Sequence, residues 1–224
     1  MDVRTWAIVA AVLHVAALAI AAIVLAPGTT GDEASRATYI ASHSQAWMAG
    51  WLAWAIATTG LLGLFLALSR RLGATPLLQL GLAAIAAAAG IEFAGHLHNA
   101  FEVVKAAAGA NADPTSLAEL GRLAIGRGSR ASFASRLEQA RWLGAAIPQP
   151  LFAIGTLIFV RAIAHAGGSR VVVVAGGASA ATSLAMAAAA LFAPEWPFSA
   201  ATAVAVTTLV VFLAGLARES RRWP

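Results

Sequence analysis

The chain has 224 residues, of which 60% are hydrophobic and only 11% charged, and its mean hydropathy is +0.78. Water-soluble domains carry about 25% charged residues, so the composition excludes an ordinary soluble domain. The net charge of +5 comes from basic residues scattered in ones and twos, without a nucleic-acid-reading motif, so we expect no nucleic-acid partner. The absence of cysteine excludes disulfides, thiolate catalysis and cysteine-ligated metal centres.

Six stretches lack Asp, Glu, Lys and Arg and are long enough to cross a bilayer as helices, which takes about 20 residues. They are continuously apolar rather than alternating, which excludes a membrane β-barrel. The sequence therefore predicts an all-α integral membrane protein, with residues 1–224 forming a single membrane domain of six transmembrane helices in a bundle. The first segment is longer than the core of a signal peptide, so we expect it to be a membrane helix. The expected helices cover residues 6–26, 46–68, 74–98, 142–164, 171–193 and 197–217.

A long connector over residues 99–141 separates the third and fourth expected helices. We expect it to be extramembrane and helical, either on the membrane surface or as an ordinary solvated connector. Within it, Asp113-Pro114 predicts the start of a short amphipathic helix. Pro148 and Pro150 predict a kink where the fourth membrane helix begins.

The basic residues of the short loops favour one orientation. If both termini are cytoplasmic, eight arginines lie on the cytoplasmic side and only Arg36 lies in the opposite short loops. The connector 99–141 would lie outside with Lys105 and five arginines, which weakens the count. We therefore predict a protein of the inner cell membrane with cytoplasmic termini. The eight arginines are Arg4, Arg70, Arg71, Arg161, Arg170, Arg218, Arg221 and Arg222.

Polar residues in the outer half of the third expected helix are the strongest functional signal, because charged groups inside a membrane are costly and usually functional. Glu92 lies about 15 residues past the helix start, roughly 22 Å along it, and is the one charge expected inside the hydrocarbon slab. Glu92, His96 and Asn99 share a helix face, which predicts a catalytic carboxylate and imidazole with a ligand-binding amide, or else a structural hydrogen bond. His98 and Glu102 share the neighbouring face, as further ligand-binding residues or as the solvated end of the helix.

A metal ion is one possible cofactor of this region. His43, just before the second expected helix, and Glu195 are expected at the same level as His96. A site of His96, His43 and Glu92 would suit zinc, copper or iron by ligand type. The spacing matches neither the zincin motif nor the paired motif of di-iron bundles, so the metal signal is weak.

Heme is disfavoured as a cofactor. Gly90 and Gly95 would let a flat macrocycle approach the third helix. However, His14 is the only other histidine well inside a membrane segment, and it is expected too far below His96 to bind the same iron.

Tryptophan is unusually frequent, and five of the seven fall at segment ends, where the membrane interface explains them. Trp51 and Trp54 continue the face of Trp47 deeper into the second helix. Core packing is the common explanation for such indoles, and the alternative is that they wall a cavity for a flat or lipophilic ligand. The five are Trp6, Trp47, Trp142, Trp196 and Trp223, and the glycines beside the deeper pair are Gly50, Gly60 and Gly63.

Three functions remain open on this evidence, and whether the chain is an enzyme stays undecided. The best supported is binding or conversion of a small lipophilic molecule at Glu92 and His96, with Trp51 and Trp54 shaping the pocket and with or without a metal ion. The second is a proton-coupled transporter of a small molecule, whose weakness is that His14 is the only ionisable group expected in the inner half. The third is a non-catalytic membrane subunit or a heme- or pigment-binding scaffold.

The expected partners are membrane lipids, a lipophilic small molecule and a second copy of the chain. Gly177, Ala181 and Ala185 repeat at four-residue spacing in the fifth helix. Such small residues permit close helix contact in membranes. They therefore predict a surface through which a homo-oligomer can form.

Overall fold

The structure, a computed structural model, describes residues 1–73, 75–110, 133–192 and 200–220, and this part of the chain is helical without a strand. Six of its helices are long and apolar enough to cross a membrane, as the sequence predicts. The residues Asp113 and Pro114 of the expected amphipathic helix, together with Glu195, Trp196 and Trp223, lie outside the described residues. The six spans are Val3–Thr29, Ser44–Leu72, Pro76–Ala110, Phe133–His165, Arg170–Phe192 and Ala200–Glu219.

The first span is not a uniform α-helix. It begins as α1 (Val3–Ile20), passes through a π turn, η1 (Ala21–Leu25), and ends in a 3-10 turn, η2 (Ala26–Thr29). The π and 3-10 turns replace the regular helix where the sequence reaches Pro27. π turns inside helices occur frequently at functional sites.

A short helix, α2 (Glu33–Ser42), follows the first span and lies between the expected helices 6–26 and 46–68. Asp32 caps it by accepting a hydrogen bond of 2.8 Å from the Ser35 amide. That bond holds the pKa of the Asp32 carboxyl below its usual range. Tyr39 fixes the other side of the helix by donating to the Val24 carbonyl oxygen at 2.8 Å.

The remaining helices run further than the expected ranges at the boundaries of the connector. The third span, α4 (Pro76–Ala110), continues well past residue 98, and the fourth begins at Phe133. Residues 99–110 and 133–141, which were expected to belong to the connector, therefore extend membrane-length helices. The other elements are α3 (Ser44–Leu72), η3 (Trp142–Ala146), α6 (Pro148–His165), α7 (Arg170–Phe192) and α8 (Ala200–Glu219).

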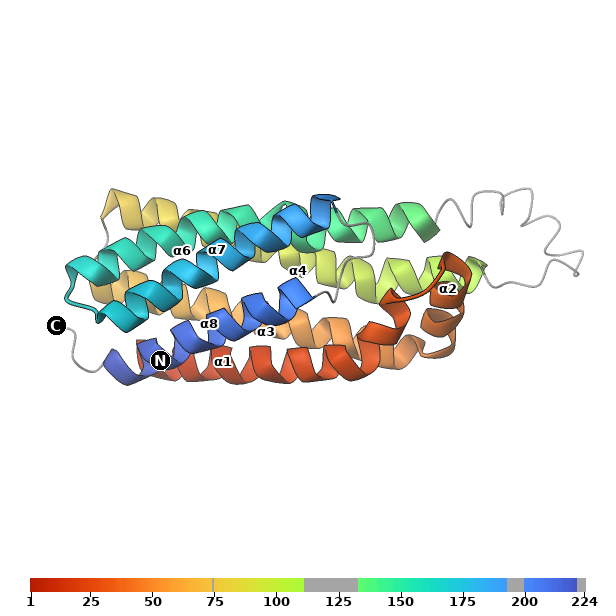
Figure 1. Cartoon of the computed structure of the whole chain (residues 1–224), viewed down its shortest axis with the longest axis horizontal. Helices are drawn as coiled ribbons and strands as arrows, with labels where there is room; N and C mark the ends of the chain where they lie inside the picture. Colours follow the sequence, from red (N-terminus) through yellow and green to blue (C-terminus); the bar gives the residue numbers. More distant parts are fainter. Residues whose placement is uncertain (74, 111–132, 193–199, 221–224) are drawn as a thin grey trace, which may run out of the picture.

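The six long helices lie side by side, and each packs against its neighbours in the chain, while α8 also packs against α1. Both the start of α1 and the end of α8 lie at one end, called the terminal end below, and α2 lies at the other (Figure 1). At the terminal end Glu219 of α8 accepts hydrogen bonds from the amide and the hydroxyl of Ser169, which precedes α7. A carboxylate of the last helix thus caps its neighbour.

Two apolar cores hold the helices together. The core of the terminal end contains large side chains from all six spans, including Leu64, Phe65, Phe159 and Phe212, which are at most 1% exposed. The core of the α2 end combines alanines and the indoles of α3 with larger buried side chains such as Leu25, Ile40 and Phe133. The indoles belong to this second core, so the predicted aromatic residues lie at the α2 end.

Candidate functional site

The α2 end contains a cavity of about 690 Å³, including its open mouth, which we call the outer cavity. Its walls are the indoles of Trp47, Trp51 and Trp54 on one side and the turn η3 on the other. Glu92 and His96 of α4 also line it. The structure therefore brings the predicted carboxylate, imidazole and deep indoles to one cavity. The further lining residues are Thr29, Arg36, Asn99, Leu137, Ala140, Arg141, Gly144, Ala145, Met186 and Thr202.

A second cavity, the inner cavity, has an empty volume of about 570 Å³ including the space open to its surroundings, and it lies closer to the terminal end. Every one of the six spans contributes to its lining, so it lies on the axis of the helices. Trp54, Glu92, Met186 and Thr202 line both cavities, which are therefore adjacent. The polar side chains that line the inner cavity are His14, Thr58, Glu92, Gln149, Thr156, Ser179, Ser183 and Thr202.

Glu92 is held at the boundary of the two cavities by neutral donors. The Thr58 hydroxyl of α3 donates to its Oε2 at 3.2 Å, and the Gln149 amide of α6 donates to its Oε1 at 3.1 Å. The Thr58 hydroxyl lies as close to the carbonyl oxygen of Trp54, at 3.2 Å, and can donate to it instead. A carboxyl group bound only by neutral groups can take up or release a proton without losing an ion pair.

His96 does not form the expected hydrogen bond with Glu92. Its ring stacks on Trp51, with centroids 5.5 Å apart and planes 28° apart, and lies 6.4 Å from the ring of Trp54. The residue is 4% exposed, and neither ring nitrogen has a hydrogen-bond partner. Buried polar atoms normally have partners, so this imidazole beside the outer cavity is an exception.

Aromatic rings continue in a row from the outer cavity into the inner one. The rings of Trp47 and Trp51 are 6.0 Å apart, and those of Trp54 and His14 are 6.3 Å apart. The rings of His14 and His96 lie 6.3 Å and 6.4 Å from that of Trp54, so the same indole borders both histidines. The His14 imidazole is itself bonded to the Ala10 carbonyl oxygen at 2.8 Å, as expected of a structural interior histidine.

Trp47 and Asn99 join the α2 ends of two helices. Trp47 is 1% exposed and donates its Nε1 hydrogen to the Asn99 carbonyl oxygen at 2.9 Å. The Asn99 side-chain amide donates to the Gly95 carbonyl oxygen at 3.1 Å. The interpretation of Trp47 as an interfacial residue is therefore wrong, because the side chain is part of the wall between α3 and α4.

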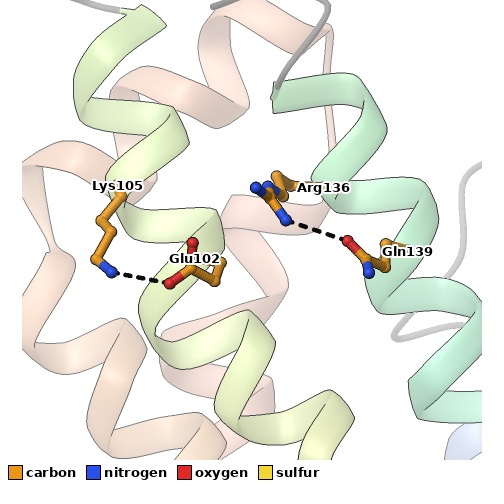
Figure 2. A network of polar contacts seen from close by, with 4 residues as sticks. All are labelled: Glu102, Lys105, Arg136 and Gln139. Carbon is orange, nitrogen blue, oxygen red and sulfur yellow. Dashed lines mark hydrogen bonds and ion pairs between the residues drawn. The ribbon is translucent and has the colours of Figure 1, made fainter.

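The other predicted polar residues lie apart from the cavities. His98 bonds the Arg136 carbonyl oxygen at 3.1 Å, and Glu102 pairs with Lys105 at 2.8 Å, beside the contact of Arg136 with Gln139 (Figure 2). His43 stacks on Tyr39 at the start of α3, with ring centroids 4.3 Å apart. Within the described ranges no three His, Asp or Glu side chains come close enough to hold a metal ion, so His43 and Glu92 do not gather around His96.

The glycines of the region serve helix contact rather than ligand access. A Cβ on Gly95 would meet the backbone of Leu143 at 2.8 Å, so η3 occupies the space proposed for a macrocycle. Gly50, Gly60 and Gly63 face Leu25, Leu13 and Trp6 of the first span and do not border the indole cavity. By contrast, Gly90 and Gly144 have open space beside them, and Gly144 lines the outer cavity.

The sequence interpretation missed Thr58 and Gln149, which hold Glu92, and the hydroxyl groups of α7 and α8. Threonine and serine satisfy themselves on the backbone of apolar helices, so single hydroxyls there carry no distinct signal. Gln149 had a signal, because an amide between two prolines at a helix start is uncommon in a membrane segment.

Comparison of the chain with protein-family models, curated proteins and solved structures finds no match. The chemistry available to the site is that of its own side chains. These are a buried carboxyl without an ion pair, a buried imidazole without a partner, and an aromatic wall between them.

Proposed function

We propose that the six helices form a bundle that spans the inner cell membrane with both termini in the cytoplasm. Large apolar side chains such as Val12, Ile23 and Val174 are more than half exposed on the outer faces of the helices, where lipid would cover them. Arginines such as Arg70 and Arg71 lie at the terminal end, and cytoplasmic loops of membrane proteins carry an excess of Lys and Arg.

We further propose that the protein binds a small lipophilic molecule between its helices, with the aromatic head of that molecule in the outer cavity. The observation that carries this proposal is a cavity with indole walls whose polar groups, Glu92 and His96, are buried and have no charged partner. Ligand sites are typically apolar cavities with a few convergent polar groups. Conversion of the ligand would use Glu92 as acid or base, because that carboxyl is the proton-exchanging group that both cavities share.

A lipid extract of the purified protein tests this function. Wild-type and variant proteins are purified in mild detergent and extracted with solvent. Mass spectrometry then measures the amount of each extracted molecule per protein chain. We expect a stoichiometric small molecule that is lost in Trp51→Ala and His96→Ala and retained in Trp142→Phe, whose indole lies outside the cavities. An extract with only bulk phospholipid in all proteins would contradict the proposal.

Proton-coupled transport is a second candidate, and the hydroxyl lining of the inner cavity favours it. These hydroxyl groups add polar lining beside His14, the only ionisable group that the sequence predicts in the inner half. The apolar core of the terminal end, with Phe65 and Phe159 in contact at 4.9 Å, closes the path in this conformation. Proteoliposomes containing a pH-sensitive dye test the candidate, since transport requires substrate-dependent proton movement that Glu92→Gln abolishes.

A metal- or pigment-binding subunit is the third candidate. Its support is limited to the His96 nitrogens, because the residues described here supply no second and third ligand. An absorption spectrum and metal analysis of the purified protein test it. A Soret band or a stoichiometric metal would favour this function over lipophile binding.

Association of copies through α7 is proposed separately. Ala181 and Ala185 are exposed, and Gly177 has open space beside it, whereas the adjacent Gly176 packs against Val160 within the chain. The small-residue face is therefore unused by the chain itself. Mass measurement in detergent, with Ala181→Leu as the disrupting variant, tests this association.

A further inference from the structure

The outer cavity contains two buried donor side chains that no protein group satisfies. The indole Nε1 of Trp54 is buried without a hydrogen-bond partner, and both nitrogens of His96 are in the same situation. The two rings lie 6.4 Å apart and tilted by 32°, and both residues line the cavity. An unmade hydrogen bond of a buried group is costly, so these atoms specify what the cavity receives.

An indole N–H can only donate, and a neutral imidazole donates from one nitrogen and accepts at the other. A ligand that satisfies both residues must therefore present an acceptor to Trp54 and either an acceptor or a donor to His96. Carbonyl oxygens can accept from both residues. A hydroxyl group can accept from either residue and can also donate to the accepting nitrogen of His96.

The aromatic wall of the cavity favours a flat group as the carrier of these oxygens. The indoles of Trp47 and Trp51 meet edge to face at 6.0 Å, and His96 stacks on Trp51, so the wall is a continuous aromatic surface. Flat aromatic rings pack on such surfaces with favourable offset or edge contacts. Leu137, Ala140 and Met186 complete an apolar lining suited to the hydrocarbon part of the ligand.

We propose that the outer cavity receives a quinone-type head group, a flat ring whose carbonyl oxygens accept hydrogen bonds from Trp54 and His96. This inference rests on the proposed lipophile-binding function and names its ligand class. The reduced hydroquinone form fits the same residues, because one hydroxyl accepts from Trp54 while the other donates to His96. No electron transfer is part of the proposal.

A lipophilic cation is the main competing occupant, since aromatic walls and a buried carboxyl attract cations. The carboxyl oxygens of Glu92 already accept from Thr58 and Gln149. Arg36 also lines the same cavity and disfavours a positive ligand, whereas the charge of Arg141 is paired with that of Glu138. The balance of charge and donors thus favours a neutral acceptor.

Isothermal titration calorimetry of the full-length protein in detergent tests the proposal, with micelle-only titrations subtracted. The probes are menadione and 2-methylnaphthalene, which share a ring system and differ in the two carbonyl oxygens. We expect menadione to bind at least tenfold more tightly than 2-methylnaphthalene. Trp54→Phe and His96→Phe, which keep an aromatic ring, should each weaken menadione about tenfold, or about 1.4 kcal/mol, and leave 2-methylnaphthalene within about twofold.

The controls are Trp142→Phe and His43→Phe, whose side chains lie outside the cavity and should not change either affinity. Equal binding of the two probes to the wild-type protein would overturn the quinone assignment and leave lipophile binding intact. Tighter binding of tetraphenylphosphonium than of menadione would overturn it in favour of a cation. If neither ring compound binds, the assignment fails. A stoichiometric extracted lipophile would then preserve the general function, and its absence would remove both.

Discussion

Glu92 and His96 lie one turn apart on α4, yet their side chains belong to different networks. Glu92 accepts from Thr58 and Gln149 on the neighbouring helices, and His96 stacks on Trp51 with both nitrogens unpartnered. The carboxyl therefore joins three helices, whereas the imidazole is left for the cavity. Their substitutions should consequently have different effects.

Replacing Glu92 by an apolar side chain should lower stability more than replacing it by the neutral amide of glutamine. In Glu92→Gln, the Gln149 amide can turn over and keep one hydrogen bond, so we expect a loss below about 1 kcal/mol. In Glu92→Leu, the buried Gln149 amide loses its acceptor, and we expect a loss of about 1–3 kcal/mol. Thermal unfolding in detergent, followed by circular dichroism, measures both changes. A double-mutant cycle with Gln149→Ala should give a coupling of at least about 0.5 kcal/mol, and additive losses would contradict the contact.

Two glycines of α4 should respond in opposite directions to the same substitution. A Cβ at Gly95 would meet the backbone of Leu143 at 2.8 Å, which cannot move aside as a flexible side chain would. Gly95→Ala should therefore cost about 1–3 kcal/mol and narrow the outer cavity. Gly90→Ala meets nothing within 4 Å and should be neutral or stabilise by about 0.5–1 kcal/mol through helix propensity. Equal effects of the two variants in unfolding measurements would contradict the close approach of η3.

The number and positions of the long apolar helices could be predicted from the sequence. A continuous apolar run without charges forms a helix in a bilayer, because a helix satisfies all its backbone hydrogen bonds internally. The ends of these helices could not be predicted. α4 continues to Ala110 through His98, Glu102 and Lys105, since these polar residues suit a helix in water as well as a connector. The first charged residues show where the apolar part of the helix ends, but the helix itself continues beyond them.

The candidate site could be predicted in part. Helical spacing placed Glu92, His96 and the deep indoles on inward faces, and the structure brings them to one cavity. The partners of Glu92 were not predictable, because Gln149 is 57 residues away in the chain and its approach depends on how α6 packs. His43 was expected beside His96 by its height alone, but height does not fix the direction in which a side chain points.

Trp47 should be more important for stability than its position at a helix start suggests. It is 1% exposed, and its Nε1 donates to the Asn99 carbonyl oxygen at 2.9 Å. Trp47→Phe loses that bond and part of the buried indole, so we expect a cost of about 1–3 kcal/mol. Trp142→Phe is the matched control, because Trp142 is 43% exposed and bonds an exposed carboxylate. Its expected effect is within about 0.5 kcal/mol, and a larger loss there than at Trp47 would refute the assignment.

The contact between Glu219 and Ser169 should stabilise the terminal end. The carboxylate accepts from both the amide and the hydroxyl of Ser169, so Glu219→Ala removes a charge-assisted cap at the start of α7. We expect a loss of about 1–2 kcal/mol in thermal unfolding. Glu138→Ala breaks an ion pair with Arg141 and a hydrogen bond from Trp142, both made to an exposed carboxylate, and should cost less than about 1 kcal/mol. Similar losses in both variants would show that Glu219 acts only as a surface charge.

The proposed topology places the two ends of the helices on opposite sides of the membrane. Because the chain has no cysteine, single cysteines report their own accessibility without background. Ala166→Cys lies after α6 at the terminal end, and Ala34→Cys lies at the start of α2 (Figure 1). A membrane-impermeant maleimide should label Ala34→Cys in intact spheroplasts and Ala166→Cys only in inverted vesicles, since the arginine-rich end faces the cytoplasm. If Ala166→Cys were labelled in spheroplasts and Ala34→Cys only in inverted vesicles, the orientation would be the opposite of the proposed one. Labelling of both cysteines from one side would contradict a bundle that spans the membrane.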